Sequence, residues 1–217
     1  MKSFSFCFLL FFVATFSLSV YGQTFKAPAN YAFSKKMPSL TPFKDSKTNL
    51  YGYKNVAGEL VVKCVYAFAS RFSEGYAAVN KGGKVSVMDE FSNDFVVNGG
   101  KWGYINEAGT LVIPLQFDAA DVFESGFAIV ESNGKKAFID VSGKKITDFV
   151  FDYVNPFAEG LAVVGGGDPL VFSYIDTTGK VVITDGYSDA GDFSKGRARV
   201  TRYGATFFIN TKGQRMK

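Results

Sequence analysis

The sequence predicts an all-β protein built from tandem repeats of about 35 residues. Three observations support this. An aromatic segment ending in an Asn/Asp-x-x-Gly turn recurs along the chain, and a Phe-x-x-Gly marker recurs with the same period. Each marker glycine then opens a Gly-x-Ala-x-Val stretch. Alternation with a period of two is typical of strands, and no helical period is evident after the first residues.

The aromatic segment occurs five times. In each copy the glycine supplies the positive φ that the turn requires, and the Asn or Asp side chain caps the turn. The glycines are spaced 51, 34, 36 and 34 residues apart, so the first interval contains an insertion. The copies are "LYGYKNVAG" (50–58), "KWGYINEAG" (101–109), "KKAFIDVSG" (135–143), "VFSYIDTTG" (171–179) and "ATFFINTKG" (205–213), with turn glycines Gly58, Gly109, Gly143, Gly179 and Gly213.

The Phe-x-x-Gly marker confirms the period independently. It appears as "RFSEG" (71–75), "VFESG" (122–126), "PFAEG" (156–160) and "DFSKG" (192–196). Another aromatic residue stands six positions before each phenylalanine. Because two patterns agree in spacing over four copies, we expect the phenylalanines to be structural residues of the repeat: Phe72, Phe123, Phe157 and Phe193.

Each unit is predicted to be a three-stranded antiparallel meander, formed by the aromatic segment, a β-branched run and the Gly-x-Ala-x-Val stretch. We place units near 50–84, 101–135, 136–170 and 171–205, with a partial unit at 206–217. An open array and a propeller-like ring both satisfy this pattern. The insertion at 85–100 is either an extra hairpin or a plain loop, and its acids match no calcium-loop spacing: Asp89, Glu90 and Asp94.

The N-terminal segment reads as an export signal. Lys2 precedes an apolar run, and Val20-Tyr21-Gly22 fits signal-peptidase cleavage, so we assign residues 1–22 to a signal peptide. The alternative is an uncleaved membrane anchor, for which the run is slightly short. After cleavage we expect no membrane span. Residues 23–49 carry five lysines against one aspartate and are predicted to form a basic arm or linker before the β domain at 50–217.

The order Lys-Trp-Gly-Tyr-Ile-Asn-x-x-Gly, then Leu-Val-Ile-Pro, then Phe-x-x-Gly-x-Ala-x-Val resembles the WG-repeat family of bacterial proteins. The resemblance covers residues 50–217, and only the second unit keeps the name-giving pair Trp102-Gly103. It implies repeated β-meanders with a binding or scaffolding role. The family provides no catalytic residues to transfer, so the resemblance adds architecture more than function.

Composition excludes several classes of site. The chain contains no histidine, which removes Ser-His-Asp and Cys-His catalysis and histidine-based metal sites. Residues 50–217 carry 18 basic and 19 acidic residues, a balance that gives no nucleic-acid footprint. No pattern indicates a catalytic, cofactor-binding or metal-binding set of residues. "GGGDP" (165–169) lacks the lysine and hydroxyl of a phosphate-binding loop, and we interpret it as a hairpin turn.

Three glutamates near the Phe-x-x-Gly marker present an enzymatic alternative. Carboxylates in pairs can hydrolyse glycosidic bonds, which would make Glu74, Glu124 and Glu159 catalytic. A catalytic pair is needed once, however, whereas these acids recur from unit to unit. We therefore interpret them as residues that cap a loop, and we expect the protein not to be an enzyme.

Departures from the repeat mark the candidate binding residues. On one face of the Gly-x-Ala-x-Val strand the first three units are apolar, but the fourth carries Arg197 and Arg199, with Arg202 close by. A polar cap on the last unit and a docking patch for an acidic partner both explain this change. Trp102 is either a core residue between strands or a stacking platform for a sugar.

The sequence therefore predicts an exported, non-enzymatic binding or protein-interaction module, located in the periplasm, at the cell surface or in the medium. Its partner is an unidentified protein or glycan, and nucleic acid is not expected. The alternatives are a carboxylate-based polysaccharide hydrolase and a purely structural component of the cell envelope.

Overall fold

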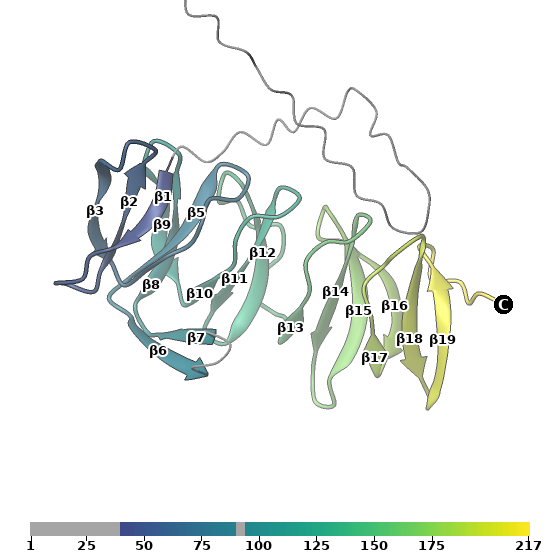
Figure 1. Cartoon of the computed structure of the whole chain (residues 1–217). Helices are drawn as coiled ribbons and strands as arrows, with labels where there is room; N and C mark the ends of the chain where they lie inside the picture. The colour runs from purple at the N-terminus through teal and green to yellow at the C-terminus, as the bar shows by residue number, and fades with distance from the viewer. Residues whose placement is uncertain (1–39, 90–93) are drawn as a thin grey trace, which may run out of the picture. The chain divides into compact units, whose positions relative to one another are not determined.

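The computed structural model describes residues 40–89 and 94–217, and within these ranges all regular structure is β (Figure 1). The strands form five antiparallel sheets of three or four strands and one separate two-stranded hairpin. The all-β repeat fold predicted from the sequence is confirmed. The predicted signal peptide, 1–22, and the part of the predicted arm at 23–39 lie outside the described residues.

The first and second sheets contain the N-terminal half of the repeats. The first sheet has the order β1 (Leu40–Lys44), β2 (Tyr51–Asn55), β3 (Leu60–Tyr66). The second sheet has the order β4 (Phe68–Ala69), β5 (Tyr76–Lys81), β8 (Lys101–Asn106), β9 (Leu111–Phe117). Between β5 and β8 the chain forms the hairpin of β6 (Lys84–Asp89) and β7 (Asp94–Asn98).

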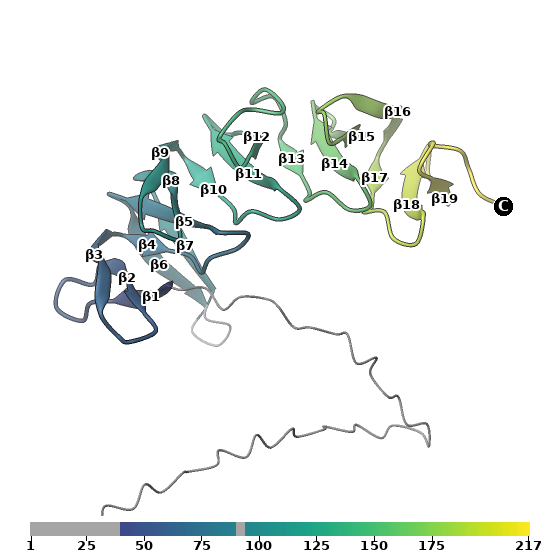
Figure 2. The same cartoon turned by 90° about the horizontal axis from the view of Figure 1, so that it is seen from above.

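The remaining three sheets follow in chain order (Figure 2). The third sheet contains β10 (Ala119–Ala120), β11 (Phe127–Ser132) and β12 (Lys135–Asp140). The fourth contains β13 (Tyr153–Val154), β14 (Leu161–Gly166), β15 (Val171–Asp176) and β16 (Val181–Tyr187). The fifth contains β17 (Asp189–Ala190), β18 (Arg197–Arg202) and β19 (Ala205–Asn210). In this described part the sheets form an open series, which decides between the two predicted arrangements.

The sheets are out of phase with the sequence repeats. Strand β5, which ends the first unit, pairs with β8, which begins the second, so that Ala78 lies opposite Tyr104. The same pairing joins β11 to β12, β14 to β15 and β18 to β19. Each sheet from the second to the fifth therefore spans a boundary between units, and backbone hydrogen bonds tie every unit to the next.

Strand β1 extends the β domain toward the N-terminus. It pairs with β2 in the position that the preceding unit fills in the other sheets, with Leu40 opposite Asn55. The sequence assigned these residues to the arm at 23–49 because they contain neither repeat marker. In the described part of the chain the β domain instead includes Leu40–Lys44, and the buried Leu40 side chain belongs to the core between the first two sheets.

The third unit lacks one predicted strand. The run "KKITDFVF" was expected to pair along its length with β12, but only two isolated bridges form, at Lys145 and Phe151. Thr147 explains the difference, because its Oγ1 accepts a 3.1 Å hydrogen bond from the Phe138 backbone N–H that a ladder would otherwise engage.

The core lies between consecutive sheets, and each inner sheet is buried on both faces. In β12, Ala137 and Ile139 pack against the preceding sheet, whereas Phe138 between them packs against the following one. Because side chains alternate along a strand, one strand contributes residues to the core on each side of its sheet. This explains why the strands are rich in apolar residues on both faces.

The turn glycines are also points of contact between units. A Cβ on Gly109 would lie 2.5 Å from Val62 Cγ2, and one on Gly179 would collide with the Ile146 carbonyl oxygen. Gly58, in the first unit, has a similar positive φ, but a Cβ added there would have no atom within 4 Å. Except at Gly58, the predicted structural role of these glycines thus includes a close approach to the preceding unit.

Candidate functional site

The marker phenylalanines pack on aromatic residues of the adjacent strand, as a structural role requires. The ring of Phe123, fully buried, lies 4.8 Å from that of Tyr104, whose hydroxyl donates a 2.6 Å hydrogen bond to the Asp121 carbonyl. Burial raises the pKa of Tyr104 above its usual range. Equivalent ring pairs are Tyr53–Phe72 at 5.3 Å, Phe138–Phe157 at 4.5 Å and Tyr174–Phe193 at 5.0 Å.

Two of the three recurring glutamates connect successive units. The two carboxylate oxygens of Glu74 accept 2.8 Å hydrogen bonds from the backbone N–H groups of Ser125 and Gly126. Glu159 accepts equivalent bonds of 2.6 and 2.8 Å from Lys195 and Gly196. The sequence predicted acids that cap a loop, and each of these two carboxylates caps a turn in the next unit.

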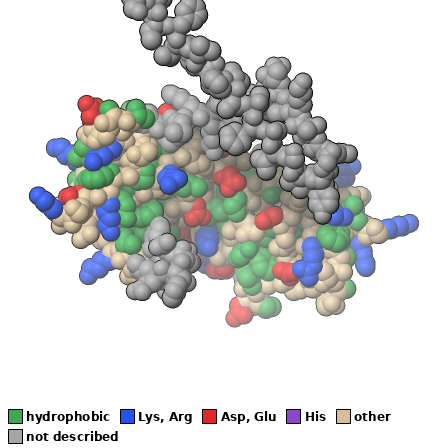
Figure 3. Space-filling view, viewed as in Figure 1, with side chains coloured by type: hydrophobic (Ala, Val, Ile, Leu, Met, Phe, Trp, Pro, Cys, Tyr) green, Lys and Arg blue, Asp and Glu red, His purple; other side chains and the backbone are tan. Residues whose placement is uncertain are grey.

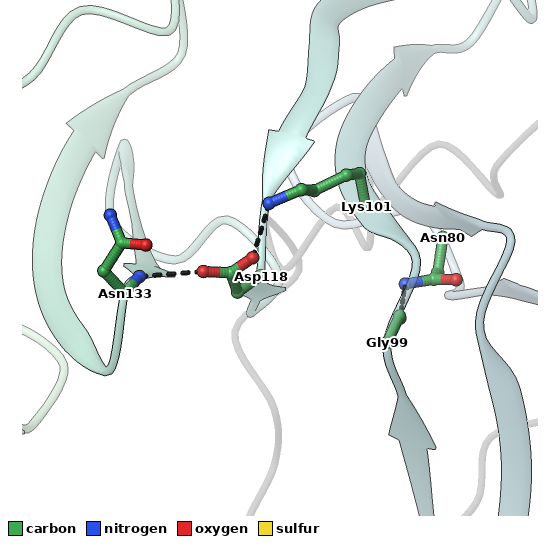
Figure 4. Close-up of polar contacts among 5 residues, drawn as sticks. All are labelled: Asn80, Gly99, Lys101, Asp118 and Asn133. Atoms are coloured by element: carbon green, nitrogen blue, oxygen red, sulfur yellow. Dashed lines mark hydrogen bonds and ion pairs between the residues drawn. The ribbon is translucent and has the colours of Figure 1, made fainter.

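Asp118 forms a further polar link at the start of the third sheet (Figure 4). Its carboxylate lies between Lys101 Nζ, at 2.6 Å, and the backbone N–H of Asn133, at 2.8 Å. These hydrogen bonds, first that from Lys101, lower the pKa of the Asp118 carboxyl. Lys135 and Asp152 form the same ion pair in the following unit. We assign both pairs to the framework of the repeat.

The inserted segment forms a hairpin, one of the two predicted possibilities. The fully buried side chain of Asn80 binds both ends of the hairpin, donating to the Gly99 carbonyl at 3.1 Å (Figure 4) and accepting from the Gly83 N–H at 3.0 Å. The side chains of Asp89, Glu90 and Asp94 lie outside the described residues. Within "GGGDP", Gly165 and Gly166 end β14, and residues 167–169 lie in the turn to β15, as the predicted hairpin turn requires.

The basic candidates divide between the two faces of the fifth sheet. Arg197 and Arg199 are exposed on one face, where Arg199 lies opposite Phe208 and the Arg197 guanidinium lies 5.0 Å from the Phe208 ring centroid. Phe208 itself is 43% exposed. We call Arg197, Arg199 and Phe208 the outer face of the fifth sheet.

Arg202 does not belong to the outer face. It is an odd number of residues from Arg197 and Arg199, so its side chain leaves β18 on the other side. There it lies 3.8 Å from the Asp185 carboxylate and 5.0 Å from the centroid of the Tyr203 ring. The sequence grouped the three arginines because they are close along the chain, but alternation along the strand separates them.

Trp102 is a core residue that also lines a cavity. Its side chain is only 8% exposed, and its ring lies 5.6 Å from that of Phe68. A cavity of about 420 Å³ lies beside it. Its lining includes the aromatic side chains of Phe127, Phe138 and Phe157 and the acidic side chains of Asp121 and Glu124. The structure therefore places Trp102 and Glu124, two sequence candidates, around one cavity.

Asp121 and Ala78 complete this cavity and were not singled out by the sequence. The surrounding protein removes water from part of the Asp121 carboxylate and raises its pKa, while Lys136 nearby opposes the shift. Alignment on the marker phenylalanines is the signal that finds these residues. It shows that Asp121 stands where other units have Ser70, Asn155 and Gly191, and that Ala78 stands where they have Ile129 and Val163.

Two other kinds of site do not occur in the described ranges. Residues 40–89 and 94–217 contain no helix with the length and apolar character needed to cross a membrane. In the same ranges no three or more Cys, Asp or Glu side chains come together as a metal site would require.

Comparison with known proteins agrees with the repeat pattern of the structure. No curated protein matches the chain by sequence. The model of the WG containing repeat family matches four segments, 51–84, 102–135, 137–165 and 172–204. Together these matches cover more than half of the chain and begin at the aromatic segment of each complete unit. The chain therefore belongs to the WG containing repeat family.

Proposed function

We propose that this chain is an exported, non-enzymatic β-repeat module that binds an acidic protein on the outer face of its fifth sheet. The observation that carries the proposal is the exposure of Arg199 and Phe208 at positions that are buried in the inner sheets, with Arg197 exposed beside them. The proposal selects a protein from the two partner classes, protein and glycan, that the sequence leaves open.

Comparison of equivalent positions supports a binding role for this face. Arg199 corresponds to Ile129 and Val163, which are 9% and 1% exposed because the next sheet covers them. Phe208 corresponds to Phe138 and Tyr174, which are 1% and 0% exposed. A face that is buried in other sheets thus carries two charges and an accessible ring here. Arginine and aromatic side chains are the residues enriched at the centres of protein interfaces.

The charge of the region favours an acidic partner. Residues 193–217 contain no Asp or Glu, and their cations are Lys195, Arg197, Arg199, Arg202, Lys212, Arg215 and Lys217. On the face shown in Figure 3, most acidic side chains lie toward the middle of the described surface, and basic side chains are most numerous toward its two ends. Such a separation of charge accelerates encounter with a partner of opposite sign.

The contacts of the recurring glutamates support a non-enzymatic role over the hydrolase alternative. Glycoside hydrolysis uses two carboxylates that flank one bond. Both oxygens of Glu74 and of Glu159 accept backbone hydrogen bonds, which occupies the groups that the hydrolase alternative requires. Of the three glutamates, only Glu124 has a carboxylate that, in the described part of the chain, is not held by such backbone hydrogen bonds. Turnover of envelope polysaccharides that disappears in Glu124→Gln would restore the hydrolase alternative.

Binding of acidic macromolecules tests the proposal directly. Residues 23–217 are immobilised, and binding of poly-glutamate, polygalacturonate and fractionated envelope protein is measured at low and physiological salt. We expect saturable binding of an acidic protein that falls at least tenfold in Arg197→Ala/Arg199→Ala. The control Lys63→Ala/Lys84→Ala removes the same charge from exposed lysines elsewhere and should bind normally.

The other outcomes point to the alternatives. Selective binding of polygalacturonate would identify an acidic glycan as the partner class. Equal binding by the arginine variant would remove the outer face from the proposal. Absence of any saturable binding would leave a purely structural envelope component. Export is tested separately by the intact mass of the protein recovered outside the cytoplasm, which should correspond to a chain beginning at Gln23.

A further inference from the structure

The cavity beside Trp102 is lined by residues that depart from the repeat. Tryptophan occurs in this slot only in the second unit, since the other units have Tyr51, Lys136, Phe172 and Thr206. Ala78, which lines the cavity from the neighbouring strand β5, is smaller than Ile129 and Val163 at equivalent positions. A larger side chain at position 78 would occupy part of the space, so the cavity depends on this departure.

The two acids at the cavity are also specific to this unit. Asp121 and Glu124 stand where the first unit has Ser70 and Ser73 and the third has Asn155 and Ala158. Among the described residues, neither carboxylate takes part in a side-chain hydrogen bond or an ion pair. Lys136 interacts with Asp121 at longer range, so the two carboxylates together leave a net negative charge.

Aromatic side chains form a further part of the cavity wall. Phe127 and Phe138 come from the third sheet, and Phe157 comes from the loop that precedes β14. Their rings pack on one another, with centroids 4.7 Å apart for Phe127–Phe157 and 4.5 Å for Phe138–Phe157. A volume of about 420 Å³ lies within the range of roughly 300–1,000 Å³ that is usual for small-molecule sites.

We infer that this cavity, which we call the Trp102 cavity, binds an organic ammonium group carried on an apolar body. The aromatic walls accept the apolar body, and the faces of their rings attract a cation. The carboxylates of Asp121 and Glu124 provide charge-assisted hydrogen bonds to the ammonium protons. The source of the group is a free amine or a lysine side chain of a partner protein.

The inference is independent of the partner proposed for the outer face of the fifth sheet. The cavity involves the second and third sheets and the loop before β14, and none of its lining residues belongs to β18 or β19. Arg197→Ala/Arg199→Ala should therefore leave amine binding unchanged, so that failure of one proposal is distinguishable from failure of the other.

The lone tryptophan of the chain provides the measurement, because Trp102 lines the cavity. The mature chain is titrated with 2-phenylethylammonium and with its neutral counterpart 2-phenylethanol while the tryptophan emission is recorded. We expect a saturable change with the ammonium compound and at least tenfold weaker binding of the alcohol. No saturable change with the ammonium compound, or equal binding of the two, overturns the inference.

Substitutions distinguish the contribution of the two carboxylates from that of the shape of the cavity. Asp121→Asn/Glu124→Gln keeps the shape and should reduce the affinity for the ammonium compound to that for the alcohol. Asp148→Asn/Asp189→Asn removes the same charge at exposed positions elsewhere and should bind as the original chain does. Unchanged ammonium binding by Asp121→Asn/Glu124→Gln contradicts the assignment of the carboxylates.

Ala78→Ile installs the residue of the next unit and should abolish binding of both probes. A thermal melt shows whether this variant folds. If it does not fold, the carboxylate variants still decide the question. A pentapeptide with one central lysine, compared with its norleucine analogue, distinguishes the two sources of the group. Selective binding of the lysine peptide indicates a protein side chain, and binding of the free amine alone indicates a small molecule.

Discussion

Glu74 and Gly126 are 52 residues apart in sequence, and a 2.8 Å hydrogen bond from the Gly126 backbone N–H to Glu74 Oε2 joins them. The bond connects a turn of one repeat to the equivalent turn of the next. It belongs to a recurring set of contacts that includes Glu159 with Gly196. Order between neighbouring repeats therefore depends on polar groups at their turns as well as on the apolar core between sheets.

Replacing Glu74 by glutamine should destabilise the array by about 1–2 kcal/mol, because a neutral amide accepts fewer and weaker hydrogen bonds from the two N–H groups. The measurement is chemical denaturation of residues 23–217. Glu124→Gln is the matched control, since that carboxylate caps no turn, and it should lie within about 0.5 kcal/mol of the original. Equal effects of the two substitutions would contradict the role assigned to Glu74.

Alanine at Gly179 should be much more destabilising than alanine at Gly58. The two glycines have similar φ values, 84° and 80°, so the cost of a left-handed residue, about 1–2 kcal/mol, is common to both. Only at Gly179 does the added Cβ meet a backbone atom, the Ile146 oxygen. Overpacking there adds about 1–3 kcal/mol. Urea unfolding of both variants checks the difference, which should vanish if the turn conformation alone selects glycine.

The hydroxyl of Tyr104 should contribute about 1–2 kcal/mol, because Tyr104→Phe leaves the Asp121 carbonyl without its partner in a largely buried setting. Tyr203→Phe makes the same chemical change at a side chain that is 91% exposed and should have almost no effect. Unfolding curves of the two variants provide the comparison. A Tyr104→Phe variant as stable as the Tyr203→Phe variant would show that the hydrogen bond is dispensable.

Asp118 should make stability sensitive to acid. Its folded pKa is lowered from the ordinary value of 3.8, so its stabilising effect is complete above that value and is lost as the pH falls through the folded pKa. Asp118→Asn should thus lower the Tm at pH 7, and the difference from the original chain should shrink below about pH 4. Melting curves from pH 7 to pH 3 test this. A Tm difference independent of pH would assign the effect of the substitution to packing.

The sequence predicted the repeats because its markers fall at positions where the fold allows few alternatives. A left-handed turn selects glycine, and the contact with Tyr104 selects Phe123, so both remain visible in the sequence. The pairing of β5 with β8 was not predictable in the same way. Spacing identifies the strands, but the boundary between units can be drawn anywhere within one period of the sequence. The boundaries of the sheets depend instead on which strands pair.

The candidate site was predictable only in part. Trp102 and Glu124 were noticed as single residues, because one is the lone tryptophan and the other recurs near a marker. Their meeting at one cavity depends on how the second and third sheets pack, which no local pattern contains. The absence of a large side chain at Ala78 is still harder to detect, since an alanine attracts no notice unless the units are aligned with one another.

The pairing of β5 with β8 determines where this chain divides into interchangeable parts. A cut at Gly100, between two units of sequence, would separate β5 from its hydrogen-bonded neighbour and leave two bare strand edges. A cut between Phe117 and Ala119 would cross no ladder, because β9 and β10 belong to different sheets. Recombination that exchanges repeats between proteins of this kind preserves whole sheets only at such junctions. The structural module is thus the sheet rather than the motif that makes the repeats recognisable.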